Sequence, residues 1–180
     1  RRSFLGWVGT GLAGGLAAAL ANGSRSGPYL LQAAIAAGHA RARRADETDW
    51  QAIARLYGAL VAEVPTPVVE LNRAVAVAMA DGPPAGLVLI EALGAEGVLD
   101  GYHLFHAARA DLLRRLGRRD EAARAYGRAL ELATNQTERA FLTRRLAEVR
   151  ADGQLEVPDD DATRRAAPPA TPRPTRRRLH

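Results

Sequence analysis

The chain has 180 residues, enough for one domain with a core of its own and tails. All 25 basic residues are arginine, and they outnumber 20 acidic residues, which gives a net charge of +5 and a pI near 10.6. Such a pI is typical of nucleic-acid-binding proteins, but residues 27–151 contain 16 arginines against 15 acidic residues. This composition disfavours a polyanion-binding surface, and the lack of cysteine excludes disulfides and cysteine-ligated metals.

Residues 1–26 form a degenerate segment rich in glycine and alanine, which we place outside the folded domain. Arg1 and Arg2, followed by an uncharged run and the small residues Ala19 and Ala21, are similar to a twin-arginine export signal. The glycines in the run disfavour a helix. We expect a cytoplasmic protein, with export as the alternative.

From Gly27 onward, apolar residues recur at helical spacing and predict two successive helices. The first begins at Gly27 and ends among arginines near Arg44. Thr48 is the expected N-cap of the second helix, with Gln51 completing a capping box. Pro65 is expected to end it.

A third and a fourth helix are predicted between residues 66 and 93. Thr66 and Pro67 supply a cap and a first-turn proline, and the third helix should end at Asp81. Residues 85–93 are apolar on nearly every side, which predicts a short buried helix. A loop is expected over residues 94–101.

The stretch 102–132 resembles a tetratricopeptide (TPR) helical hairpin, with Gly117 as the left-handed cap between its helices. The predicted apolar stripe of the first helix consists of Leu104, Ala108, Leu112 and Leu116. The predicted stripe of the second helix consists of Ala122, Tyr126, Ala129, Leu130 and Ala133. Since such a hairpin cannot bury its apolar face alone, more helices should flank it.

A last helix is predicted from Asn135, which with Glu138 has the spacing of a capping box, to about Ala151. Residues 152–180 are rich in proline and arginine and poor in apolar residues, which predicts a disordered tail. The sequence therefore predicts an all-α, TPR-like array of about seven helices over residues 27–151.

Three residues are candidates for partner binding. Asn72 lies on the apolar stripe of the third helix, where an unpaired amide costs about 1–3 kcal/mol. It either bonds a neighbouring helix or faces a groove and holds the main chain of a partner segment. Arg73, next to it, and Arg109 are the other two candidates.

A basic patch is possible around the turn of the 102–132 hairpin. Its members are Arg114, Arg115, Arg118 and Arg119. Neighbouring acidic residues could neutralise it.

Catalytic chemistry has little support in the sequence. His103, His106 and Asp111 could approach a metal only if a further carboxylate came close, and packing or surface roles are expected for both histidines. No strand pattern, phosphate-binding glycine loop or nucleophile elbow is present. We expect a protein that is not an enzyme and that needs neither cofactor nor metal.

Several ordered blocks resemble the C-terminal TPR-like extension of one group of extracytoplasmic-function (ECF) RNA polymerase sigma factors. The main blocks are GPYLLQAAIAA at 27–37, TDW at 48–50, LNRAVAVA at 71–78, YHL at 102–104 and AARADLL at 107–113. Together with shorter matches they cover about residues 27–149. The segment before Gly27 departs from the family, and the regions that bind promoter and core polymerase do not occur in this sequence.

The resemblance implies a protein-interaction and regulatory module that acts in transcription initiation. Its implied partners are the sigma-factor core regions or RNA polymerase, with a regulatory protein as a further candidate. No membrane contact and no direct sequence-specific DNA binding are implied. The alternative is a free-standing TPR-like adaptor unrelated to transcription, and the coding sequence upstream of Arg1 would distinguish the two.

Overall fold

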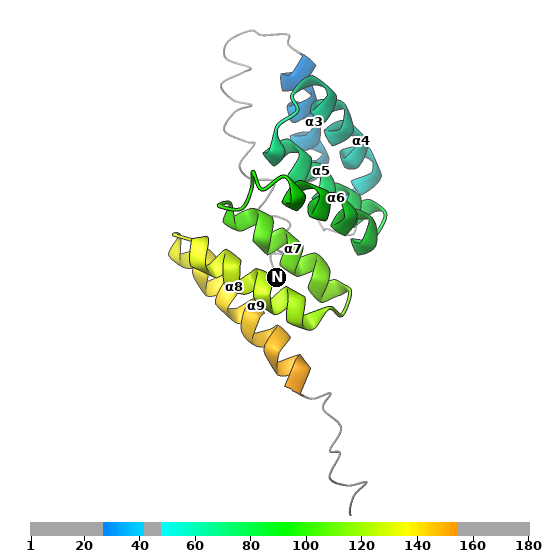
Figure 1. The fold of residues 1–180 in the computed structure, drawn as a ribbon. Coiled ribbons are helices and arrows are strands. Elements are labelled where there is room, and N and C mark those ends of the chain that lie inside the picture. The colour runs from blue at the N-terminus through cyan, green and yellow to red at the C-terminus, as the bar shows by residue number, and fades with distance from the viewer. Residues whose placement is uncertain (1–26, 42–47, 155–180) are drawn as a thin grey trace, which may run out of the picture.

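The computed structural model describes residues 27–41 and 48–154, and these residues form seven helices and no strand (Figure 1). The prediction of an all-α fold is confirmed. The predicted export signal within residues 1–26 and the tail from residue 155 lie outside the described residues. The helices are α3 (Gly27–Arg41), α4 (Trp50–Glu63), α5 (Pro67–Ala80), α6 (Pro83–Ala95), α7 (His103–Arg115), α8 (Arg119–Leu132) and α9 (Gln136–Gln154).

The helices stack in sequence order, each packed on the next, with α3 at one end of the array and α9 at the other (Figure 1). In addition, α5 contacts α7, and His103 of α7 pairs with Glu138 of α9. α7 therefore lies next to both α5 and α9, as expected when helical hairpins repeat. None of the described helices has the length and hydrophobicity needed to span a membrane.

The N-termini of α4, α5 and α9 are capped by short polar side chains, whereas those of α6, α7 and α8 have no side-chain cap. Asp49, and not the predicted Thr48, caps α4, because its carboxylate accepts a hydrogen bond from the Ala52 N–H at 2.9 Å. Thr66 caps α5 as predicted. Asn135 also takes its predicted role, since its Oδ1 accepts from the backbone N–H groups of Thr137 and Glu138.

Helix α6 is longer and less uniformly buried than predicted. It begins at Pro83, because proline fits the first turn of a helix, and it reaches Ala95. Val88 is 69% exposed, since α6 buries one side on α5 and α7 and leaves the other open. Gly86 faces α5 so closely that an added Cβ would lie 2.3 Å from the Ala78 Cβ.

The predicted hairpin is present as α7 and α8. Gly117 adopts a positive φ of 74° in the turn, as the cap requires. Most of the two predicted stripes is buried, and Leu104, Leu116 and Leu130 are partly buried at its margins. Asp111, which the prediction did not include among the buried residues, is also buried.

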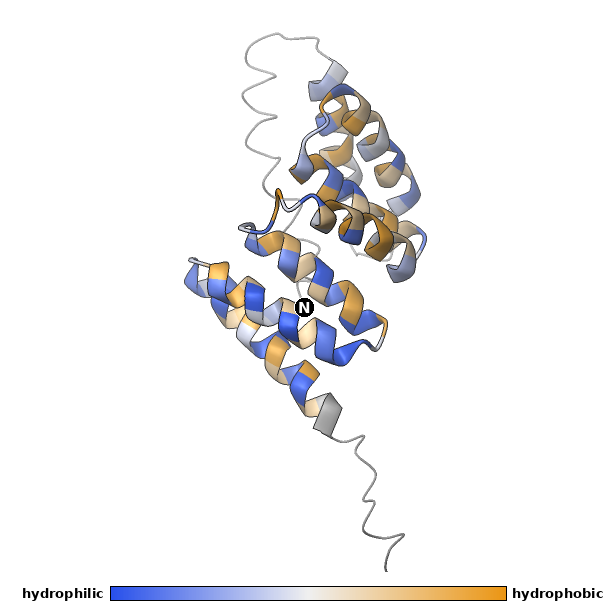
Figure 2. Cartoon of the chain, in the orientation of Figure 1, coloured by the Kyte–Doolittle hydropathy of each residue, from blue (hydrophilic) through white to orange (hydrophobic). Residues whose placement is uncertain are grey.

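Two hydrophobic cores lie along the array. The larger core takes buried residues from α5 to α9, and the smaller core consists of Ile35, Ile53, Tyr57, Leu60, Val69 and Ala76. Hydropathy changes along the array, since α6 is mostly hydrophobic whereas α8 and α9 carry many hydrophilic residues (Figure 2).

One boundary prediction was wrong. Helix α9 continues to Gln154, so residues 152–154 belong to the helix and not to the tail, because helix propagation past Val149 costs little.

Candidate functional site

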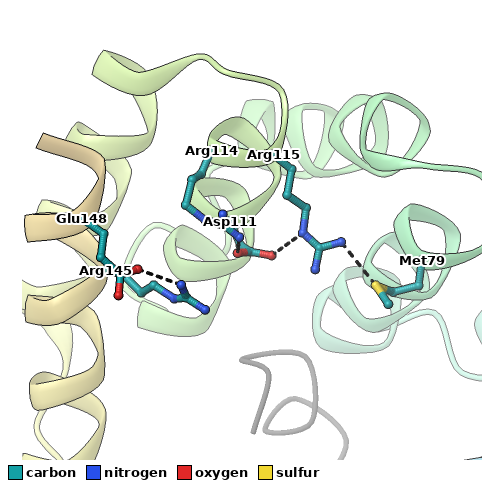
Figure 3. Close-up of polar contacts among 6 residues, drawn as sticks. All are labelled: Met79, Asp111, Arg114, Arg115, Arg145 and Glu148. Atoms are coloured by element: carbon teal, nitrogen blue, oxygen red, sulfur yellow. Dashed lines mark hydrogen bonds and ion pairs between the residues drawn. The ribbon is translucent and has the colours of Figure 1, made fainter. Parts of the chain in front are cut away.

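Side chains of α5, α7 and α9 form a surface with several hydrogen-bonded and ion-paired residues. We call this surface the α5/α7/α9 face. Figure 3 shows six of them: Met79, Asp111, Arg114, Arg115, Arg145 and Glu148. They come from three helices that are not consecutive in sequence. The pairs of Asp111 with its arginines and of Arg145 with Glu148 are local i+3 and i+4 contacts, whereas the contact of Arg115 with Met79 depends on how the helices pack.

Asp111 is the centre of this arrangement. Its side chain is only 5% exposed, and its two oxygens accept from different arginines. Arg114 Nη2 lies 2.7 Å from Oδ1, and Arg115 Nε lies 2.8 Å from Oδ2. A buried carboxylate is costly unless it is paired and hydrogen-bonded, so both guanidinium groups are needed to hold Asp111 inside the array.

The two arginines extend the contacts of Asp111 to neighbouring helices. Arg115 Nη1 donates to the Met79 sulfur of α5 at 3.4 Å (Figure 3). Arg114 hydrogen-bonds the Tyr126 side chain of α8. Burial, together with the charge of Asp111, raises the pKa of Tyr126 to about 12, so its hydroxyl stays protonated at neutral pH. The group therefore links α5, α7 and α8.

The same face continues on α9. Arg145 Nη1 donates to Glu148 at 2.8 Å, and the Arg145 guanidinium lies 5.4 Å from the centre of the Phe141 ring. The Nε atoms of Arg114 and Arg145 are buried and have no hydrogen-bond partner in the described part of the chain. Both atoms are enclosed within the array and not presented to solvent.

The predicted basic patch is largely neutralised by acidic neighbours. Arg114 and Arg115 share Asp111, and Arg118 pairs with Glu121 at 2.7 Å. Arg119 also has an interaction partner. These arginines therefore stabilise the turn between α7 and α8, and they do not form an open cationic surface.

The three predicted partner-binding residues do not form one site. Arg109 pairs with Glu91 of α6 at 2.9 Å, and Arg73 lies against Gly58 of α4. Asn72 is 6% exposed. It is seven residues from Met79, so the two lie on the same face of α5.

Asn72 is largely buried, but its amide is not among the buried side-chain atoms that lack a hydrogen-bond partner. Its two expected roles, a hydrogen bond to a neighbouring helix or contact with the main chain of a partner segment, both stay predictions.

The candidate metal ligands are engaged elsewhere. His103 Nε2 lies 2.9 Å from Glu138 Oε2, and His106 Nε2 lies 2.9 Å from the Asp100 carbonyl oxygen. Within residues 27–41 and 48–154, no three His, Asp or Glu side chains converge as a metal site. Burial, with a smaller effect of Glu138, raises the pKa of Tyr102 next to this pair.

Sequence reasoning missed the central role of Asp111, although a signal for it was present. Asp111 is three residues from Ala108 on the predicted stripe, and Arg114 and Arg115 follow at the i+3 and i+4 positions. The contacts of Arg115 with Met79 and of Arg114 with Tyr126 had no such signal, because the paired residues lie 36 and 12 positions apart in the sequence.

No family model matches the chain, and no solved structure matches it. An uncharacterized protein of Rhizobium meliloti (strain 1021) is 50% identical to it over 128 residues. The match covers 71% of this chain and 30% of that protein. The chain thus corresponds to less than a third of the length of this relative.

Proposed function

We propose that this chain is a protein-interaction module, and that it serves as the C-terminal regulatory extension of an ECF-type RNA polymerase sigma factor in transcription initiation. The TPR-like array supplies the interaction surface, and the sequence blocks quoted above supply the connection to sigma factors. The module would act in the cytoplasm, where RNA polymerase is, through contacts with the sigma core regions or the polymerase.

The observation that carries a binding role is the position of Asn72, a polar side chain that is 6% exposed on a helix whose other buried residues are apolar. An amide can hydrogen-bond the main chain of a partner segment through both its donor and its acceptor atoms.

Charge supports a protein partner over nucleic acid. The arginines of this face and of the α7–α8 turn are mostly paired with Asp111, Glu121 and Glu148. Paired arginines release few counterions from a duplex, so they add little to DNA affinity.

The length of the relative supports a module within a larger protein. More than two thirds of the Rhizobium meliloti protein lies outside the match, which leaves room for other domains. We expect the coding sequence upstream of Arg1 to encode sigma regions in frame. A different upstream domain would favour the free-standing or otherwise linked adaptor.

The test is a calorimetric titration of the chain against the separately expressed sigma regions. Asn72→Leu should weaken binding at least about tenfold, because the hydrogen bonds of the amide to the partner's main chain are lost. Unchanged affinity of Asn72→Leu would show that the amide is not used in binding.

Arg145→Ala and Arg128→Ala form a matched control pair. Each arginine donates to a glutamate three residues on, Glu148 at 2.8 Å and Glu131 at 2.9 Å, but Arg128 is on α8, away from the face. We expect Arg145→Ala alone to weaken binding of the sigma regions. Equal losses in both variants would mean that the face is not the contact surface.

A further inference from the structure

Charge is separated along the array, although its total is close to zero. Residues 50–101, from α4 to the segment after α6, contain two arginines and six acidic residues, a net charge of −4. Residues 102–154, from α7 to the end of α9, contain 11 arginines and seven acidic residues, a net charge of +4. We call these parts the acidic half and the basic half. A partner that approaches the array therefore meets opposite potentials on the two halves.

On the α5/α7/α9 face, which lies mainly in the basic half, each carboxylate is shared by two arginines. Asp111 of α7 accepts from the arginines three and four residues on, at 2.7 and 2.8 Å. On α9, Glu148 lies 2.8 Å from Arg145 and 4.0 Å from Arg144. Four guanidinium groups thus meet two carboxylates, which leaves these two groups of side chains with a joint charge of +2.

The two groups lie near each other. Figure 3 shows Arg145 of α9 beside Asp111 and Arg114 of α7. Burial raises the pKa of Tyr126 to about 12, and the positive charges of Arg114 and Arg145 oppose this rise. Both guanidinium groups must therefore lie close enough to the Tyr126 hydroxyl to act on it through space. The joint positive charge is concentrated where α7, α8 and α9 meet.

Apolar side chains lie among the charged ones on this face. The guanidinium groups of Arg144 and Arg145 lie 5.6 and 5.4 Å from the centre of the Phe141 ring. Phe141 and Met79 are only partly buried against the larger core, so part of each side chain remains accessible. A ligand that fits this face therefore combines negative charges and apolar groups in one short stretch.

We propose that the α5/α7/α9 face binds an acidic polypeptide segment of a partner protein, in which glutamate or aspartate is interspersed with apolar residues. The carboxylates of the segment pair with Arg144 and Arg145, and its apolar side chains pack on Phe141 and Met79. The acidic half repels the segment, which confines it to the basic half. The proposal rests on the proposed role as a protein-interaction module, and it holds whether or not the partner is a sigma factor.

The positions of two glutamates on α9 favour a polypeptide over nucleic acid. Glu138 and Glu148 lie on either side of Phe141 in the helix, about 15 Å apart along its axis. Arg144 and Arg145 lie between them. A polypeptide segment can place its carboxylates only where the arginines are. A phosphate backbone carries a charge on every nucleotide and would meet both glutamates.

The first experiment is a calorimetric titration of the full chain with a short synthetic peptide of glutamate and leucine. We expect saturable binding that weakens as salt is added, and no binding of the matched peptide with glutamine in place of glutamate. Arg144→Glu should weaken binding about tenfold, and it should fold because the Arg144 side chain is 67% exposed.

Arg55→Glu is the matched control variant. Arg55 is an exposed arginine of the acidic half, so the substitution changes the net charge by the same amount as Arg144→Glu. We expect Arg55→Glu to leave the affinity for the acidic peptide within about twofold. Equal losses in the two variants would show that binding follows the total charge and would overturn the proposal.

Glu148→Gln should act in the opposite direction. It removes the carboxylate that Arg144 and Arg145 share, so the affinity for the acidic peptide should rise about threefold. Glu131→Gln is the control, since Glu131 pairs with Arg128 at 2.9 Å in the same way but on α8, away from the face. It should change the affinity less. Weaker binding by Glu148→Gln would contradict the proposal.

Parallel titrations with the separately expressed sigma regions and with promoter duplex distinguish this proposal from the proposed function. Binding of the sigma regions without binding of the acidic peptide would overturn the acidic-segment proposal and leave the proposed function intact. Binding of the acidic peptide alone, with the pattern of variants above, would support the proposal while the sigma-factor role fails. Tighter binding of duplex than of the peptide, lost in Arg144→Glu, would assign the face to nucleic acid and overturn the proposal.

Discussion

The two hydrophobic cores of the array differ in size and in position. The larger core has 22 buried residues, 20 from the five helices α5 to α9 and two, Leu99 and Ala133, from the segments between them, and the smaller core has six from α3, α4 and α5. Only α5 contributes to both, through Leu71 and Val75 on one side and Val69 and Ala76 on the other. In an array, each unit is stabilised by its neighbours, so the end with one neighbour and a small core should open first.

The cores also differ in side-chain size and in whether a buried ion pair links their helices. Nine of the 22 residues in the larger core are alanine, which allows the helices to approach closely, and the Asp111 group links three of those helices. The smaller core has larger side chains but no buried ion pair among the described residues.

The largest expected losses of stability come from truncating a fully buried leucine in each core. Leu113→Ala and Leu60→Ala remove fully buried leucines, and each should cost about 2–5 kcal/mol. Leu113→Ala should lower hydrogen-exchange protection from α5 to α9, whereas Leu60→Ala should affect α3 and α4 alone. Uniform loss of protection in both variants would show that the array unfolds as a single unit.

Alkaline pH should weaken both cores through one tyrosine in each. Burial raises the pKa of Tyr57 and of Tyr126 to about 12, from an ordinary value of 10.0. The stabilisation from each neutral hydroxyl is present below pH 10 and is lost as pH rises through about 12, by up to about 3 kcal/mol. Unfolding by urea at several pH values measures it.

Substituting phenylalanine distinguishes the contributions of Tyr57 and Tyr126 to the loss of stability at alkaline pH. Tyr126→Phe should also cost about 1 kcal/mol at neutral pH because Arg114 loses its hydrogen bond, and Tyr57→Phe should cost less. Each variant should remove part of the alkaline loss. A pH profile that neither variant changes would mean that other groups cause it.

The close crossing of α5 and α6 can be tested with glycines. Gly86→Ala places a methyl group against the Ala78 Cβ and the Ala74 carbonyl oxygen, which should cost about 1–3 kcal/mol. Gly127→Ala, in α8 with no atom near the new methyl, should stabilise by up to about 1 kcal/mol. Thermal unfolding measures the stability of both variants. An unchanged melting temperature in Gly86→Ala would mean that α5 and α6 can move apart at little cost.

The sequence predicted the helices and the hairpin turn because apolar spacing, Gly117 and the prolines are local signals. It misplaced the α4 cap by one residue because Thr48 and Asp49 are both good capping residues. It did not predict the partners of Asp111, Arg109 or His103 beyond their own helices. Those contacts depend on how the hairpins stack, which no local pattern specifies.

The central claim is that the chain acts through protein contacts as a sigma-factor module. The most direct measurement titrates the array, without the residues after Gln154, against the sigma regions and against promoter duplex at two salt concentrations. We expect saturable binding of the sigma regions, and weak duplex binding without sequence preference. Specific submicromolar duplex binding would contradict the claim if it disappeared on neutralising Arg114, Arg115, Arg118 and Arg119.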